Sequence, residues 1–313
     1  MASPQVVAEI VRSGFVEGHH YGSVLALAAD GGVDWSVGAV DVPILPRSCN
    51  KPLQALAMVR LGLDLPDELL ALTCASHSGE PFHLDGVRRI LAVADVPEGA
   101  LQTPPDFPLD DRSREDLLRS GEDRSPIAMN CSGKHAGMLV TCALNGWELA
   151  TYREPDHPLQ VAIAETFAEL TGEPVTGVAV DGCGAPLLPT SLVGLARAFG
   201  RLATAADGPE ARVAGAIRRH PEWVSGTHRD ERALLTALPG AIGKAGAESC
   251  YAVALPDGRA FTLKTDDGAP RVRPVLMAAA LRRLGVDAPV LDDVGRVAVY
   301  GGGRRVGDIR PVW

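Results

Sequence analysis

Short runs of β-branched and apolar residues, separated by glycine-rich turns, occur at both ends of this 313-residue chain, whereas helical apolar spacing dominates between them. Such runs with glycine punctuation are typical of hairpins in an antiparallel sheet. The N-terminal runs are residues 6–11, 24–28 and 33–37, and the C-terminal runs are residues 249–255, 260–264, 297–300 and 305–309. The pattern therefore predicts a sheet assembled from the two terminal regions of the chain.

Between these ends, helix-opening prolines and 3.6-residue apolar spacing predict a series of helices. The segment 103–125 is rich in Pro, Asp and Arg and is interpreted as a long surface loop, and residues 175–180 are interpreted as a short buried strand. The fold class expected is α+β, a mostly antiparallel sheet with central helices that cover it or form a lobe. We expect one domain over residues 1–313, with a helix-rich region at about 50–240.

Charge and cysteine usage limit the classes of function. A formal net charge of -9 and scattered Lys and Arg argue against nucleic-acid and anionic-membrane partners. No secretory signal or bilayer-spanning run is visible, so a cytoplasmic location is expected. The six cysteines are widely spaced without a C-x-x-C pair, which in a reducing compartment favours buried thiols, metal ligands or catalytic groups over disulfides.

Ser48 and Lys51, three residues apart at the start of an apolar run, form the most informative local motif. On a helix, residues at this spacing lie one turn apart on one face, within reach of each other. A serine hydroxyl becomes a nucleophile when a neighbouring base takes its proton, and a neutral lysine amine can be that base. Arg47 is a candidate for a neighbouring cation that favours the neutral amine. In isolation, the same spacing favours an N-cap serine and a solvated lysine of the first helical turn over a catalytic pair, so the motif becomes informative only together with others.

Further polar turns follow along the chain, and two of them contain glycine next to cysteine. They are Ala75-Ser76-His77-Ser78-Gly79-Glu80, Asn130-Cys131-Ser132-Gly133-Lys134-His135, Asp181-Gly182-Cys183 and Gly243-Lys244. The second opens a helix and the third follows the predicted strand, positions where side chains and backbone donors converge. Together with Arg47-Ser48-x-x-Lys51-Pro52 these motifs, in this order, resemble the asparaginase II family, the L-asparaginases of the Rhizobium etli inducible type.

The resemblance implies a fold like the serine β-lactamases and glutaminases, a homodimer, and hydrolysis of L-asparagine to L-aspartate and ammonia. It implies two catalytic serine-lysine pairs: Ser48 as nucleophile with Lys51 as its base, and Ser76 with Lys244 facing them as a proton relay. It also implies a zinc ion held by Cys131, Lys134 and Cys183 and completed by water. Two thiolates suit zinc, and a lysine ligand requires a neutral amine.

The substrate-binding candidates surround these groups. Arg47 and the turn after Asn130 are candidates to bind the α-carboxylate of the substrate. The full set is Arg47, His77, Asn130, His135, Asp181 and Gly182. His77 and His135 fit core histidines as well as site residues, and Cys131 and Cys183 fit buried thiols as well as metal ligands. Cys49, a thiol directly beside the expected nucleophile, departs from the family pattern.

Two other classes of function stay open on the sequence. One is a different serine-lysine amidohydrolase, such as a glutaminase or a β-lactamase-like amidase. The other is a non-catalytic zinc-binding or metabolite-binding protein. Comparing asparagine, glutamine and a chromogenic β-lactam as substrates separates the first alternative, and stoichiometric zinc without amide hydrolysis would support the second.

Overall fold

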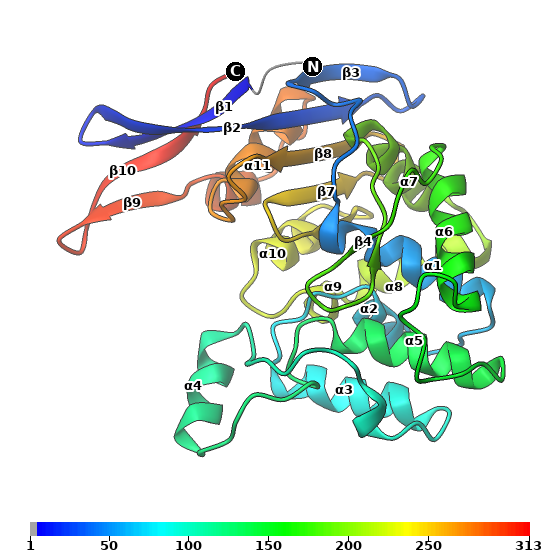
Figure 1. The fold of residues 1–313 in the computed structure, drawn as a ribbon. Coiled ribbons are helices and arrows are strands. Elements are labelled where there is room, and N and C mark those ends of the chain that lie inside the picture. Colours follow the sequence, from blue (N-terminus) through cyan, green and yellow to red (C-terminus); the bar gives the residue numbers. More distant parts are fainter. Residues whose placement is uncertain (1–4) are drawn as a thin grey trace. The chain divides into compact units, whose positions relative to one another are not determined.

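The computed structural model describes residues 5–313, which form two compact units (Figure 1). The sheet unit comprises residues 5–49, 190–204 and 233–313. The helical unit comprises residues 50–189 and 205–232. The chain passes from the first to the second between Cys49 and Asn50, directly inside the Ser48-Lys51 motif.

The sheet unit contains one eight-stranded antiparallel sheet in the order β6-β7-β8-β2-β1-β10-β9, with β3 paired to β2. The strands are β1 (Gln5–Arg12), β2 (Phe15–Leu27), β3 (Val33–Val37), β6 (Ile242–Ala245), β7 (Cys250–Ala254), β8 (Ala260–Thr265), β9 (Ala298–Gly301) and β10 (Arg304–Pro311). Strands from the two terminal regions lie side by side, because β1 pairs with both β2 and β10, and β2 pairs with β8 (Figure 1). The sheet expected from the two ends of the chain is confirmed.

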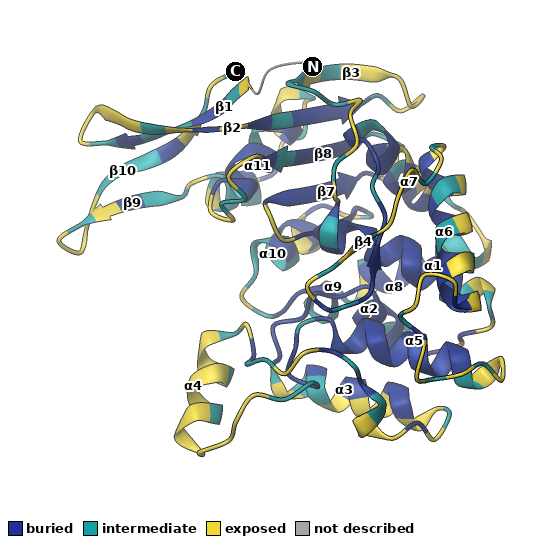
Figure 2. Cartoon of the chain, in the orientation of Figure 1, coloured by how far each residue is buried: buried dark blue, intermediate teal, exposed yellow. Residues whose placement is uncertain are grey.

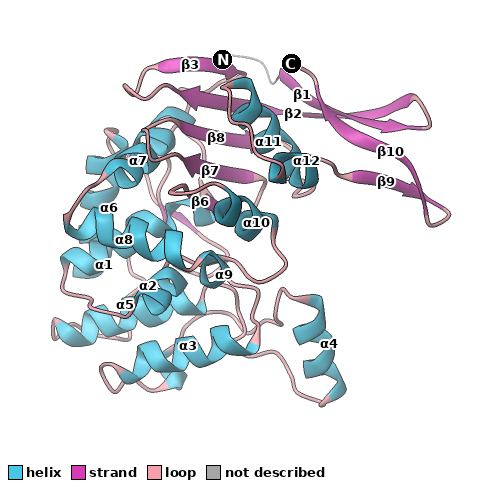
Figure 3. Cartoon of the chain, turned by 180° about the vertical axis from the view of Figure 1, so that it is seen from behind, coloured by secondary structure: helices cyan, strands magenta, loops and turns pink. Residues whose placement is uncertain are grey.

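Helices cover the middle of this sheet. Every residue of β7 is buried. Because successive side chains of a strand point to opposite faces of the sheet, both faces of this strand are covered. Two helices, α7 (Leu192–Thr204) and α11 (Arg273–Arg283), pack on β7 and β8, and the Thr262 hydroxyl of β8 donates to the Leu192 carbonyl at 2.9 Å. Figure 3 shows α11 and the short α12 (Val290–Val294) beside the strands.

The helical unit is built mainly from helices that bury apolar faces against one another. They are α1 (Lys51–Arg60), α2 (Asp67–Thr73), α3 (Pro81–Ala92), α4 (Asp111–Arg119), α5 (Ser132–Leu144), α6 (Pro158–Thr171), α8 (Gly208–Arg219) and α9 (Pro221–Val224). The most extensive helix–helix packing joins α3 with α5, α1 with α6 and α2 with α8. A further helix, α10 (Asp230–Ala237), runs from the helical into the sheet unit. The 3-10 turns are η1 (Arg47–Asn50) and η2 (Glu98–Ala100).

Two local predictions are wrong. The segment 103–125 is not a continuous loop, because it contains α4, which has no buried residue (Figure 2). Asp110 caps this helix by accepting the Ser113 amide at 2.8 Å, a signal hidden in a segment dominated by charge. The predicted strand at 175–180 shrinks to β4 (Ala179–Val180), paired with β5 (Pro186–Leu187), and Val180 is exposed rather than buried.

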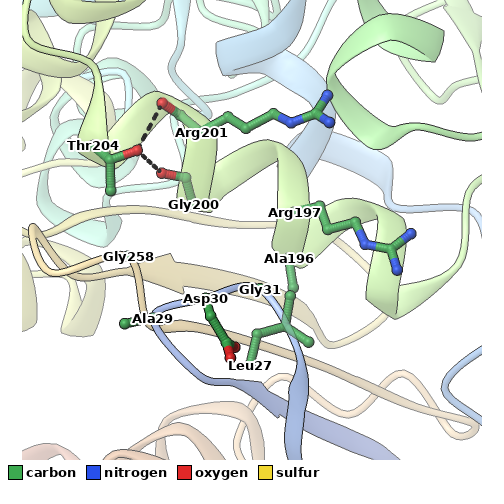
Figure 4. A pocket seen from close by; sticks show the side chains of 10 residues that line it. All are labelled: Leu27, Ala29, Asp30, Gly31, Ala196, Arg197, Gly200, Arg201, Thr204 and Gly258. Carbon is green, nitrogen blue, oxygen red and sulfur yellow. Dashed lines mark hydrogen bonds between the residues drawn. The ribbon is translucent and has the colours of Figure 1, made fainter.

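A cavity of about 310 Å³ lies in the sheet unit between α7 and the turns at Gly31 and Gly258 (Figure 4). Arg197 and Arg201 of α7 line it. It contains none of the residues predicted to form the functional site. Over residues 5–313, no helix is both long and apolar enough to cross a membrane.

Candidate active site

The expected nucleophile lies in the short turn before α1 rather than on the helix itself. Ser48 belongs to η1, is 7% exposed, and precedes Lys51, the first residue of α1. Pro52 in the first helical turn is tolerated because its missing amide would have no helical partner. Arg47 adopts φ = 51°, an uncommon conformation for a residue with a side chain. Such backbone strain is concentrated at functional sites.

Lys244, the lysine expected in the second pair, lies in the edge strand β6 of the same unit. Its side chain is fully buried, and the ammonium donates to the Ala245 carbonyl at 2.8 Å. The Lys244 carbonyl accepts a hydrogen bond from the Cys49 thiol at 3.0 Å. The sheet unit thus brings the residue after Ser48 into direct contact with Lys244.

Lys51 and Ser76 meet inside the helical unit. Lys51 is fully buried, and its Nζ donates to Ser76 Oγ at 3.0 Å and also to the Ala75 carbonyl. Ser76 is 8% exposed. A buried amine in contact with a serine hydroxyl can exchange a proton with it. The contact joins the lysine of one expected serine-lysine pair to the serine of the other.

His77 is held by hydrogen bonds on both ring nitrogens. Its Nδ1 accepts the Gly79 amide at 3.1 Å, so Nε2 carries the proton and donates to Ser132 Oγ at 2.8 Å. Burial lowers the pKa of His77 well below its ordinary value, and the nearby His83 and Lys51 lower it further. The neutral ring therefore ties the Ser76 turn to the start of α5, and its expected role in substrate binding stays a prediction.

Cys131, Lys134 and Cys183 gather in one buried cluster in the helical unit, with exposures of 3%, 1% and 1%. The Lys134 ammonium donates to Cys183 Sγ at 3.1 Å. A hydrogen bond between the two thiols holds the pKa of Cys183 far below that of a free thiol and raises the pKa of Cys131. Burial alone would lower the pKa of Lys134, but the two sulfurs and Asp181 outweigh it and raise that pKa. The cluster is thus a buried thiolate-ammonium pair beside a second thiol.

This donor set fits zinc on one condition. Over residues 5–313, no group of three or more His, Cys, Asp or Glu side chains is placed to hold a metal ion. Zinc at this cluster would therefore need the two sulfurs and Lys134, with the amine and Cys131 deprotonated. Soft thiolates are preferred zinc ligands, so the chemistry of the sulfur pair suits the ion.

The other candidate residues surround the sulfurs. The Asn130 side-chain oxygen accepts from Cys131 Sγ at 3.1 Å, and Asp181 Oδ2 lies 3.8 Å from Cys183 Sγ. The Gly182 amide donates to Asp181 Oδ1 at 2.9 Å, which fixes the carboxylate at the turn. His135 is fully buried, and this burial lowers its pKa to about 4, although a hydrogen bond with Cys183 acts in the opposite direction.

Sequence reasoning missed Tyr152, which supports His135 from a separate loop. The Tyr152 hydroxyl and His135 Nδ1 are 2.6 Å apart, and Tyr152 is fully buried. Its hydroxyl also accepts the Gln102 amide at 3.3 Å. A lone tyrosine between helices carries no spacing pattern, so no sequence signal could have identified it. Glu248 was also missed, and it lies 3.6 Å from the Arg47 guanidinium.

The start of α5 is fixed by close packing on α2. A methyl group at Gly133 would lie 2.6 Å from the Leu72 carbonyl oxygen. Only glycine lets the two helices approach this closely, which places Lys134 and Cys131 beside the loop that carries Cys183. Packing thus explains Gly133, and the hydrogen bond to Cys183 explains Lys134.

Comparison with solved structures finds distant similarities. A β-lactamase from Mycobacterium bovis is 15% identical, with a TM-score of 0.40 over 85% of this chain and 95% of that chain. A hydrolase with promiscuous acyltransferase activity is 13% identical, with a TM-score of 0.42 over 88% of this chain and 93% of that chain. A Bacillus subtilis glutaminase in covalent complex with 5-oxo-L-norleucine is 12% identical, with a TM-score of 0.36 over 83% and 88% of the two chains. No curated protein matches the chain.

The family comparison is decisive, because it covers almost the whole chain. The family model described as L-asparaginase II matches residues 8–311. The protein is therefore an amidohydrolase, and it belongs to the L-asparaginase II family.

Proposed function

We propose that the protein is an L-asparaginase that hydrolyses L-asparagine to L-aspartate and ammonia with Ser48 as its nucleophile. Membership of the L-asparaginase II family supports the substrate. The observation that carries the chemistry is the buried Lys51 amine, which donates to Ser76 Oγ at 3.0 Å and lies three residues after Ser48 in the chain. A buried amine in contact with a serine hydroxyl is suited to move protons at that hydroxyl.

In the first half of the proposed reaction, Ser48 Oγ attacks the side-chain amide carbon of asparagine and loses its proton to Lys51. Backbone N–H groups stabilise the oxyanion that develops on the amide oxygen. The carbon–nitrogen bond then breaks, and the leaving nitrogen takes up a proton and departs as ammonia. Ser76 and Lys244 relay protons to and from Lys51.

In the second half, a water molecule attacks the aspartyl ester on Ser48, a base takes its proton, and the serine oxygen leaves with a proton returned. The substrate's α-carboxylate needs a cation, and Arg47 beside Glu248 supplies one on the turn that carries Ser48. His135, Asp181 and the turn after Asn130 are the remaining candidates for substrate contacts.

Zinc is proposed as a cofactor held by Cys131, Lys134 and Cys183. When bound, zinc would supply a Lewis acid and a fixed positive charge. Asp181 and Asn130 would orient the sulfur ligands through the contacts already described. If the ion only positions substrate, chelation should raise KM and leave most of kcat, whereas complete loss of kcat would assign it a direct chemical role.

The central experiment measures ammonia release from asparagine by wild-type protein and by Ser48→Ala. We expect Ser48→Ala to lose at least about 10³-fold in kcat, because removal of a nucleophile leaves only residual catalysis. Ser225→Ala is the matched control: Ser225 is also buried, at 0% exposed against 7% for Ser48, and its hydroxyl donates to the Pro221 carbonyl at 3.3 Å. Near wild-type turnover by Ser48→Ala would remove the mechanism.

The same assay separates the alternatives. Higher kcat/KM for glutamine than for asparagine would indicate a glutaminase, and turnover of a chromogenic β-lactam would indicate a β-lactamase-like enzyme. Stoichiometric zinc with no amide hydrolysis would instead support a non-catalytic binding protein. We also propose a homodimer and a cytoplasmic location, which light scattering and cell fractionation would test.

A further inference from the structure

The Cys49 thiol joins two parts of the proposed machinery that are distant in the chain. Cys49 directly follows Ser48 and is fully buried in the sheet unit. Its Sγ donates to the carbonyl of Lys244, 195 residues further along, at 3.0 Å. This bond ties the turn that carries Ser48 to the backbone of β6, the strand that carries Lys244.

The neighbouring backbone is packed too closely to adjust. Gly246 follows β6, and a Cβ there would lie 2.9 Å from the Pro46 carbonyl oxygen, 3.2 Å from Cys49 Sγ and 3.3 Å from the Ser48 amide nitrogen. Any side chain at Gly246 would push the Ser48 turn away from the strand. The end of β6 therefore lies directly against the backbone of the expected nucleophile.

The turn that carries Gly246 is itself anchored. The Gly246 amide donates to the Cys250 carbonyl at 2.8 Å, and the Arg273 guanidinium donates to the Gly246 carbonyl at 3.5 Å. The same guanidinium lies over the Tyr251 ring, 5.3 Å from its centroid. A rigid strand end gives the thiol a fixed acceptor, so its hydrogen bond can hold the Ser48 turn in place.

We propose that Cys49 is a positioning residue, whose thiol hydrogen bond to the Lys244 carbonyl sets the placement of Ser48 relative to the strand that carries Lys244. This rests on the proposed function, because it takes Ser48 and Lys244 as the reacting groups. Displacement of a reacting group by about 1 Å can cost about 100-fold in rate, so a single buried hydrogen bond at this place affects turnover. The thiol takes no part in bond making.

The first test compares Cys49→Ala, Cys49→Ser and the control Cys142→Ala. Cys142 is equally buried, but lies near the end of α5, outside the proposed site. We expect Cys49→Ala to lower kcat about 10-fold to 100-fold with little change in KM, because the turn that carries Ser48 loses its hydrogen bond to the strand that carries Lys244. Cys49→Ser keeps a donor and should recover kcat to within about threefold of the wild type. Equal kcat in wild type and Cys49→Ala would overturn the proposal.

A second measurement tests whether the effect of Cys49 on Ser48 depends on Lys244. A fluorophosphonate labels an activated serine: the serine oxygen forms a bond to phosphorus, the phosphorus–fluorine bond breaks, fluoride leaves and the serine proton goes to the neighbouring base. The labelling rate of Ser48 is measured in wild type, Cys49→Ala, Lys244→Met and the double variant. If Cys49 acts by placing Ser48 relative to Lys244, Cys49→Ala slows labelling in the wild-type background and not in Lys244→Met.

The outcomes separate this inference from the proposed function. Labelling of Ser48 without asparagine hydrolysis would refute the substrate and still report on Cys49. Equal slowing by Cys49→Ala in both backgrounds would refute positioning through Lys244. Should Cys49→Ala fail to fold, Cys49→Ser and Cys49→Thr give the same comparison. Serine keeps the donor, whereas the extra methyl group of threonine displaces it in the packed turn. Equal labelling rates in these two variants would overturn the proposal. No labelling of the wild type would overturn both proposals.

Discussion

Removal of Cys183 from the metal-free protein should destabilise it through the charge left behind on Lys134. The ammonium and the Cys183 sulfur are 3.1 Å apart, and Lys134 is only 1% exposed. With an effective dielectric constant of about 20, unit charges at that distance attract by about 5 kcal/mol. Breaking one side of such a buried pair typically costs about 3–5 kcal/mol, because the remaining charge is uncompensated. We therefore expect Cys183→Ala to lower the free energy of unfolding by about 3–5 kcal/mol.

The double variant makes this prediction sharp. Lys134→Met fills a similar volume without charge, so Lys134→Met/Cys183→Ala should be more stable than Cys183→Ala alone. The assay is urea unfolding at pH 7 in excess chelator, followed by fluorescence, with Cys142→Ala as the control for loss of a buried thiol. If the losses of unfolding free energy in Cys183→Ala and in Lys134→Met added up to the loss in the double variant, the pair would carry no buried charge and the reasoning would be refuted.

Two other variants test single features of the helical unit. Burial lowers the pKa of His83 to about 4, so the unfolded state binds a proton near pH 6.5, whereas the folded state binds it only near pH 4. The free energy of unfolding should therefore fall as the pH drops through this window, by about 1.4 kcal/mol per pH unit for one proton. In urea unfolding, His83→Gln should reduce this dependence on pH. A slope unchanged by His83→Gln would contradict this. Gly133→Ala should cost about 1–3 kcal/mol, because its methyl group meets the Leu72 carbonyl, whereas Gly177→Ala, with nothing within 4 Å, should stay within about 0.5 kcal/mol in the same assay.

The sheet could be predicted from the sequence because its hairpins carry strong local signals. The turn at Asp30-Gly31-Gly32 and the glycine run after Tyr300 separate alternating apolar residues, and β3 and β9 begin within a residue or so of the expected positions. The charged sequence of α4 gave no apolar stripe to detect, so its helix depended on a cap, which is a weaker signal. Likewise, Val178 and Val180 are exposed, and the apolar pattern of 175–180 alone could not show which side would be covered.

Only those residues of the candidate site that belong to a local sequence motif could be predicted. The polar turns identified Lys51, Ser76, Cys131 and Cys183, and the structure places the first two, and separately the last two, in direct contact. What joins the motifs was not predictable, because Tyr152 contacts His135 through tertiary packing and the Cys49 bond spans most of the chain. Spacing in the sequence is informative within one turn or helix and carries no information across a fold.

The pairing of β1 with β10 has a consequence for biosynthesis. All the other described elements are synthesised between β1 and β10, so the β1 edge of the hairpin formed by β1 and β2 keeps an open row of amides and carbonyls until β10 has emerged from the ribosome. A nascent chain stalled before β10 would present that row to other chains, and ribosome-bound fragments should recruit chaperones until β10 is made.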